Sequence, residues 1–154
     1  MATRRRAADP APRALHVAVP SARYGEPVPA VVDASLIAAL LFAEPEQRAA
    51  AQRMVHFRPV APDLLPYELA NVAADKMRRG EVEAVVHNSL GELAALGIEL
   101  HAVAAPLAFE VAAKYGLTAC DAAYLALAGR LRCPLLTFDN RLAEAARRHL
   151  GASE

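Results

Sequence analysis

The chain is divided into short apolar runs separated by longer segments with a helical repeat. The runs at 30–33, 58–61, 98–103 and 135–138 predict buried β-strands. Between them, apolar residues spaced three and four apart predict helices at 36–42, 46–57, 64–79, 81–96, 106–115, 118–132 and 140–150. Strands that alternate with helices pair in parallel, so the pattern indicates an α/β sandwich.

Two of these helices carry distinct signals. Asp63 suits the N-cap of the helix over 64–79, and Pro66 falls in its first turn, where a missing N–H costs little. The helix that ends at Arg132 is apolar almost all round, which predicts a buried, central position.

Residues 1–29 differ in composition from the rest. They hold five prolines and five arginines among small residues. Because this composition supplies no core, we predict an extended or disordered tail over 1–29, one globular domain over 30–150 and a short tail over 151–154. The adjacent arginines 4–6 leave nucleic-acid binding open, and an arginine-rich transit peptide is a further interpretation.

Composition narrows the classes of function. The chain has 154 residues, 55% of them hydrophobic, with 17 basic and 17 acidic side chains. A body without net positive charge is not a general polyanion binder, so nucleic acid would bind at a local site. No apolar run reaches the ~18 residues of a membrane span, and the start matches neither a Sec nor a twin-arginine signal. We therefore expect a cytoplasmic protein.

The cysteines and histidines form no catalytic or zinc-binding pattern. Cys120 and Cys133 lie outside any Cys-x-x-Cys, and the five histidines are scattered. We predict two reduced, buried thiols, with a Cys120–Cys133 disulfide as the alternative. A cysteine or histidine hydrolase finds no support.

Four acidic residues stand at the edges of apolar segments. Asp33 and Asp139 end predicted strands, Asp121 begins a helix, and Glu68 lies one turn into another. In open parallel sheets, sites form beyond the carboxyl ends of the strands. Asp33 and Asp139 should therefore share one rim of the sheet, with Asp121 and Glu68 within reach.

Carboxylates gathered in one cleft repel one another, and Mg²⁺ or Mn²⁺ would relieve that repulsion. Such ions take oxygen ligands, often together with a substrate phosphate. The chemistry that follows is hydrolysis of a phosphodiester by a metal-activated water. Ser35 and Thr137 would position water or phosphate, and Asn140 would add a neutral ligand.

Each of these residues also has a simpler interpretation. The three aspartates suit N-caps of the helices that follow them, and Glu68 suits the surface of an amphipathic helix. Ser35, Thr137 and Asn140 suit caps or turns. Only the occurrence of four acids together at core edges favours a metal site.

Four stretches, in order, resemble the PIN domain and most closely its VapC-type toxins. They are V-V-D-A-S (31–35), A-P-D-L-L-P-Y-E-L-A-N-V (61–72), L-T-A-C-D-A-A-Y-L-A-L-A (117–128) and P-L-L-T-F-D-N-R-L-A-E-A-A (134–146). The resemblance implies a three-layer α/β/α sandwich with a mostly parallel sheet of four or five strands. It also implies that the catalytic and metal-binding acids are Asp33, Glu68, Asp121 and Asp139. Ser35 would be the hydroxyl beside the first acid and Asn71 the asparagine one turn after the glutamate.

The same resemblance implies a function and partners. The expected protein is a Mg²⁺- or Mn²⁺-dependent endoribonuclease, the toxin of a toxin–antitoxin pair, that forms a homodimer and binds RNA and a cognate antitoxin. The alternatives are a PIN-domain RNA-processing nuclease that is not a toxin and a non-catalytic PIN scaffold that binds RNA or protein. Scaffolds of this kind usually lose one or more acids, whereas all four are present here.

Overall fold

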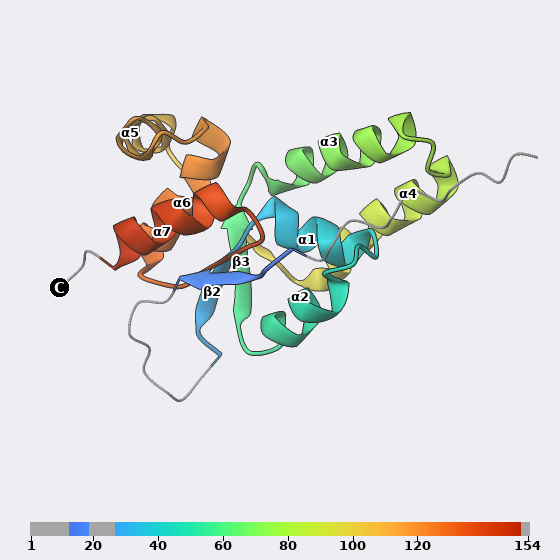
Figure 1. The fold of residues 1–154 in the computed structure, drawn as a ribbon, viewed down its shortest axis with the longest axis horizontal. Helices are drawn as coiled ribbons and strands as arrows, with labels where there is room; N and C mark the ends of the chain where they lie inside the picture. Colours follow the sequence, from blue (N-terminus) through green and yellow to red (C-terminus); the bar gives the residue numbers. More distant parts are fainter. Residues whose placement is uncertain (1–12, 19–26, 152–154) are drawn as a thin grey trace, which may run out of the picture.

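A computed structural model describes residues 13–18 and 27–151, and Figure 1 shows the fold. Five strands form one sheet in the order β1-β5-β2-β3-β4. The strands are β1 (His16–Ala18), β2 (Pro29–Val32), β3 (Arg58–Pro62), β4 (Glu99–His101) and β5 (Leu135–Thr137). Strands β5, β2, β3 and β4 run parallel, and β1 pairs antiparallel with β5. The mostly parallel sheet confirms the predicted α/β class.

Helices cover both faces of this sheet. They are α1 (Ala34–Leu41), α2 (Gln47–Met54), α3 (Leu65–Arg78), α4 (Glu83–Gly91), α5 (Ala105–Tyr115), α6 (Ala119–Leu131) and α7 (Asn140–Leu150), with a 3₁₀ turn η1 (Glu92–Leu96). Consecutive residues Ala30, Val31 and Val32 are fully buried, and successive strand side chains point to opposite faces. Both faces of β2 are therefore covered, which gives the sandwich its three layers.

Helix α6 forms the centre of one outer layer. It contacts β2, β3 and β5, while α5 and α7 pack beside it (Figure 1). Its residues from Ala122 to Ala128 are all buried, as its uniformly apolar sequence predicts. Helices α3 and α4 pack together and project from the other side of the molecule.

The structure corrects two helix boundaries. Helix α3 is capped by Leu64 and not by Asp63, because the first helical hydrogen bonds run from the Tyr67 and Glu68 N–H groups to the Leu64 carbonyl. The single helix predicted over 81–96 is divided: α4 ends at Gly91 and a 3₁₀ turn follows. A glycine weakens a helix at the position where it stands, which accounts for the division.

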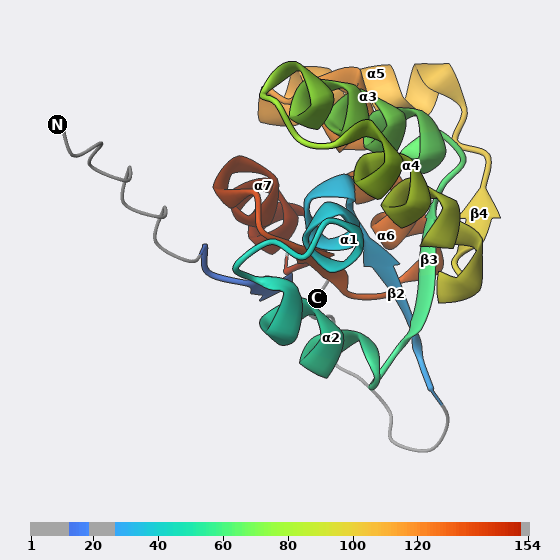
Figure 2. The same ribbon diagram turned by 90° about the vertical axis from the view of Figure 1, so that its right-hand side faces the viewer.

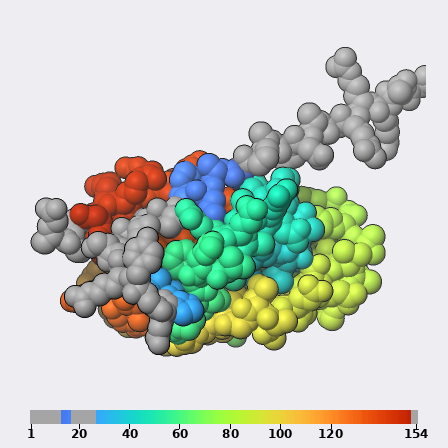
Figure 3. Space-filling view, turned by 90° about the horizontal axis from the view of Figure 1, so that it is seen from below, coloured from blue at the N-terminus to red at the C-terminus, as the bar shows by residue number. Residues whose placement is uncertain are grey.

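Part of the predicted N-terminal tail belongs to the sheet. His16 pairs with Thr137, Val17 with Leu136 and Ala18 with Leu135. Seen from below, this blue strand lies between the red helix α7 and the teal helices α1 and α2 (Figure 3). Composition predicts an unpaired segment, whereas the pairing depends on a partner more than a hundred residues away. Residues 1–12, 19–26 and 152–154, including the arginines 4–6, lie outside the described residues.

The structure bears on the predictions made for the cysteines and for membrane spans. Both cysteines are free, and Cys133 is buried as predicted, but Cys120 is exposed on the first turn of α6. None of the helices in the described part of the chain is long and apolar enough to cross a bilayer.

Candidate active site

Asp33 is the most enclosed of the four acids. It directly follows β2 and forms the N-cap of α1, where its Oδ1 accepts the Leu36 N–H at 3.0 Å. It is only 5% exposed. The capping interpretation is therefore confirmed for Asp33, and the remaining carboxylate oxygen faces the end of β5.

Two hydroxyls link Asp33 to the neighbouring strand. Ser35 Oγ donates to both Asp33 oxygens, at 2.8 and 2.9 Å, and Thr137 Oγ1 donates to Oδ2 at 2.6 Å. Each hydroxyl also accepts a backbone N–H, Ser35 from Phe138 and Thr137 from Asp139. These bonds hold the ends of β2 and β5 together around one carboxylate.

Asp139 lies on the same rim because β5 is the parallel neighbour of β2. It caps α7, with its Oδ1 accepting the Leu142 N–H at 2.8 Å. Its charge is one cause of the raised pKa of Asp33, so the two carboxylates face each other closely enough to interact. The predicted meeting of these two strand ends is observed.

Glu68 reaches the rim from the first turn of α3. Tyr124, from the centre of α6, donates its hydroxyl to Glu68 Oε2. Burial raises the pKa of Glu68, and the charges of Asp121 and Asp33 raise it further. Glu68 thus faces the other acids and is affected by the charges of Asp121 and Asp33, so it is not a surface residue of an amphipathic helix.

Asp121 differs from the other two aspartates. It stands in the first turn of α6, where Thr118 is the N-cap and accepts the Asp121 N–H at 3.1 Å. The Thr118 hydroxyl in turn donates to Asp121 Oδ2 at 2.7 Å. The N-cap alternative is therefore wrong for Asp121, because the helix begins earlier, at Thr118.

Burial and the repulsion between neighbouring carboxylates both raise pKa values among these acids. Burial, together with the charge of Asp139, outweighs the three hydrogen bonds and raises the pKa of Asp33 to about 6. Although the Cys120 residue is exposed, partial burial of its thiol raises its pKa, and the charges of Glu68 and Asp121 raise it further. A thiol kept protonated is a poor nucleophile and a poor metal ligand, so the oxygen ligands and not Cys120 are the candidates for holding an ion.

The donor chemistry of the rim fits a hard divalent cation. Oxygen-only ligands and mutually repelling carboxylates suit Mg²⁺ or Mn²⁺. Across residues 13–18 and 27–151, however, no three His, Cys, Asp or Glu side chains form a ready-made metal-binding group. Asp33, Glu68 and Asp121 are each engaged by a neighbouring hydroxyl.

The two asparagines proposed for the site occupy different surroundings. Asn71 is exposed on α3, one turn after Glu68. Asn140 Oδ1 accepts a hydrogen bond from His16 Nε2 at 2.6 Å, which ties the first residue of α7 to β1. In this structure Asn140 fastens the edge strand, and its predicted role as a neutral ligand stays a prediction.

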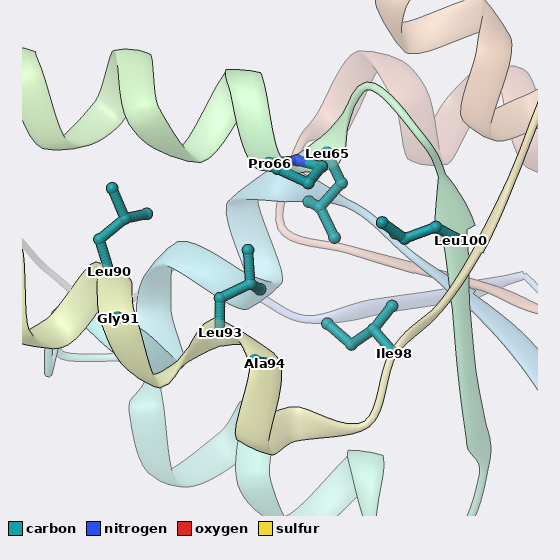
Figure 4. Close-up of a pocket in the computed structure, with 8 residues that line it drawn as sticks. All are labelled: Leu65, Pro66, Leu90, Gly91, Leu93, Ala94, Ile98 and Leu100. Carbon is teal, nitrogen blue, oxygen red and sulfur yellow. The ribbon is translucent and has the colours of Figure 1, made fainter.

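The acids do not line the apolar pocket shown in Figure 4. That pocket lies between α3, α4, η1 and β4, and its walls include Leu65, Leu90, Leu93, Ile98 and Leu100. A second cleft, of about 330 Å³, is lined by Ser35 on one side and by Lys76 and Arg79 of α3 on the other. The second cleft, and not the apolar one, adjoins the rim.

Sequence reasoning missed two residues of the site. Tyr124 carries a signal, since a tyrosine within an otherwise apolar, buried helix needs a partner for its hydroxyl. Thr118 stands three residues before Asp121, the spacing of a capping box. Both signals were present in the sequence, but only the fold shows that their partners are Glu68 and Asp121.

Comparisons with known proteins identify the family and the fold. The PIN domain family matches residues 30–148. The chain is 40% identical over 120 residues to "Ribonuclease VapC3" of Pyrobaculum aerophilum, covering 74% of this chain and 92% of that protein. The crystal structure of PAE2754, also from Pyrobaculum aerophilum, has the same fold, with a TM-score of 0.61 and 24% identity over 82% of this chain and 91% of that one.

Proposed function

The chain belongs to the PIN domain family, and on that premise we propose that it is a Mg²⁺- or Mn²⁺-dependent endoribonuclease, the toxin of a toxin–antitoxin pair. The relative named Ribonuclease VapC3 supports RNA as the substrate. A cognate antitoxin, a homodimer and a cytoplasmic location are parts of the same proposal.

One observation carries the proposal: a single Thr137 hydroxyl joins the Asp33 carboxylate to the backbone of Asp139, and the charges of Asp33 and Asp121 act on Glu68. The charge of Asp139 contributes to the raised pKa of Asp33, and the charges of Asp121 and Asp33 contribute to the raised pKa of Glu68. Carboxylates that lie close together at the edge of a core repel one another, and a bound cation would relieve that repulsion. The residues that would hold the ion are Asp33, Glu68, Asp121 and Asp139.

The chain's own residues prepare this site. A bound Mg²⁺ or Mn²⁺ would supply a Lewis acid for the phosphate and lower the pKa of a water. Ser35 and Thr137 fix the orientation of Asp33, Thr118 that of Asp121 and Tyr124 that of Glu68. Hydrogen-bonding partners of this kind keep carboxylates in place before the substrate arrives.

Cleavage of RNA by purified protein tests the proposal. We expect cleavage with Mn²⁺ or Mg²⁺, none in EDTA, and recovery when the metal is restored. Asp33→Asn and Asp121→Asn should each reduce cleavage to background. Asp75→Asn is the control, because Asp75 is an exposed acid of α3 paired with Arg78. Cleavage that persists in EDTA or in both site variants would contradict the proposal.

The toxin role needs a separate experiment. Induced expression of the wild type should arrest growth, and Asp33→Asn should not. A wild type that cleaves RNA without arresting growth would instead support an RNA-processing nuclease. Binding of RNA without any metal-dependent cleavage would support the non-catalytic scaffold.

A further inference from the structure

A cationic pocket begins beside the acidic rim and lies between the end of α5 and one side of α7, from Asn140 at the start of that helix to Arg148 in its last turn. Its volume is about 280 Å³, and its walls include Tyr115, Leu117, Asn140, Arg141 and Arg148. None of these residues was singled out by the sequence except Asn140. Lys114, the neighbour of Tyr115, adds a further positive charge at this place.

The pocket is fixed next to two of the acids by the chain itself. Asn140 directly follows Asp139, and Leu117 directly precedes Thr118, which binds Asp121. The Arg141 guanidinium donates to the Gly116 carbonyl at 2.8 Å. That bond ties the turn before α6 to the start of α7, so the pocket stands between the helix starts that carry Asp121 and Asp139.

The positive charges of this pocket are not neutralised. In the described part of the chain, Lys114, Arg141 and Arg148 have no carboxylate within 4 Å. Lys114 Nζ lies 5.2 Å and Arg148 Cζ 5.6 Å from the centre of the Tyr115 ring. Glu144 is the acidic residue of the wall, and it is paired with Arg147.

The cleft beside Ser35 provides a contrast. There Arg13 is bonded to Glu44 and Glu46, and Lys76 to Glu44 and Glu81. Within the described residues Arg13 and Lys76 are thus held by acids and Arg79 is not, whereas Lys114 and Arg148 beside Tyr115 both lack an acidic partner and are free to bind an anion. Burial lowers the pKa of His149, which is bonded to Tyr115, and the nearby charge of Lys114 lowers it further.

We propose that this pocket binds single-stranded RNA beside the bond to be cut, with Arg148 and Lys114 contacting backbone phosphates. The inference rests on the proposed ribonuclease function and names the part of the surface that holds its substrate. Arg148 lies in the last turn of α7, about 13 Å along the helix from Asp139. An RNA strand that passes four carboxylates needs positive charge nearby, and this pocket supplies it for the part of the strand next to the reacting phosphate. Guanidinium groups pair with phosphates, and arginine or tyrosine planes can stack with unpaired bases.

Equilibrium binding of a fluorescent, single-stranded RNA tests the inference without cleavage. The assay is run in EDTA and again with Ca²⁺, at several salt concentrations. Arg148→Gln is compared with Arg147→Gln, a matched control on the same helix with the same loss of charge but a carboxylate partner of its own. Arg148→Gln should weaken binding about tenfold and reduce the salt slope by about 0.7, while Arg147→Gln should change both far less.

Further variants separate charge from structure. Arg148→Lys should retain most of the salt slope, because it keeps the positive charge. Lys114→Gln should weaken binding as Arg148→Gln does, and the melting temperature of each variant shows whether the fold is intact.

Two results would overturn the inference. One is equal affinity of Arg148→Gln and Arg147→Gln for RNA, which would also be the outcome if the pocket served an acidic protein. The other is a wild type that binds no RNA in either buffer. If both variants bind RNA equally but metal-dependent cleavage is normal, the pocket inference is contradicted and the proposed ribonuclease function still holds. If Arg148→Gln weakens RNA binding but the wild type cleaves no RNA, the pocket inference holds and the ribonuclease function is contradicted.

Discussion

At the scale of single residues, Asp33 combines a structural and a chemical role. It caps α1 and is held by Ser35 and Thr137, yet burial and Asp139 raise its pKa from 3.8 to about 6. The folded protein therefore holds this proton more tightly than the unfolded chain. Without metal, the contribution of Asp33 to stability is full below about pH 4 and is lost as the pH rises to about 6, a change of about 3 kcal/mol.

The first prediction follows from the upward direction of the Asp33 pKa shift. In EDTA, Asp33→Asn should be more stable than the wild type at pH 8, by up to about 3 kcal/mol, because the variant buries no charge. The difference should disappear near pH 4. Urea denaturation across this range measures it, and a variant that is less stable at pH 8 would show that the carboxylate is well solvated or already compensated.

Thr137 gives a second prediction. Its hydroxyl donates to Asp33 and accepts the Asp139 N–H, so Thr137→Val leaves the Asp139 N–H without this acceptor and removes one of the hydrogen bonds to the buried Asp33 carboxylate. The free energy of unfolding should fall by about 1–3 kcal/mol.

Thr118→Val is the matched control for Thr137. It removes an exposed cap of α6 that bonds another acid, Asp121, and should cost about 1 kcal/mol. Chemical denaturation of both variants at one pH compares them. Equal costs would mean that the enclosed hydroxyl network contributes no more than a surface cap.

At the scale of elements, the packing of α6 against α7 determines the geometry of the rim. Asp121 starts α6 and Asp139 starts α7, so any shift between the two helices moves two acids apart. The contact depends on Gly129: a Cβ at this position would lie 2.6 Å from His149 Nε2. His149 itself is bonded to Tyr115 of α5 at 3.0 Å, with the two rings in an edge-on arrangement.

A third prediction concerns this contact. Gly129→Ala should force the imidazole away from Tyr115 and lower the free energy of unfolding by about 1–3 kcal/mol. Gly91→Ala is the control, since it lies at the end of α4 with open space around it and should gain up to about 1 kcal/mol from helix propensity. Thermal unfolding separates the two, and a Gly129→Ala protein as stable as the wild type would show that His149 moves without cost.

At the scale of the whole molecule, the N-terminal strand β1 covers one edge of the parallel part of the sheet. Strand β1 covers the edge of β5, the strand that carries Thr137 and leads to Asp139. Arg13 extends the attachment, with its N–H and guanidinium on Glu46, which is only 5% exposed. Burial would raise the pKa of Glu46, but the bonds from Arg13 prevail and lower it. Figure 2 shows β1 beside α2 and α7, at the far side of the sheet from β4.

The fourth prediction tests this closure. Removal of residues 1–18 should expose the edge of β5 and leave Glu46 without its partner, so the protein should lose stability and self-associate through the free edge. Light scattering and melting temperature measure the two effects. A chain that begins at Arg13 keeps every contact described here and is the control. If both chains behave alike, β1 is dispensable for the domain.

The order of strands and helices could be read from the sequence, because apolar periodicity, glycine stops and caps are local signals. The same signals identified Asp33 and Asp139 as residues at strand ends. They failed where two local signals competed: Asp121 looked like a cap until the structure showed Thr118 in that place. For Asp63 the prediction was wrong by one residue, since the first hydrogen bonds of α3 are accepted by the Leu64 carbonyl.

What the sequence determined by itself, then, was the α/β class, the set of four acids and membership of a family whose motifs occur in order along the chain. Only the tertiary structure decided that β1 joins the sheet, that Thr137 and Tyr124 hold the acids, and that unpaired cations gather around Tyr115 beside the rim. The physical reason is sequence separation. Thr137 and Asp33 stand 104 residues apart and Tyr124 and Glu68 56 apart, so each pair meets only after the sheet and its helices have packed.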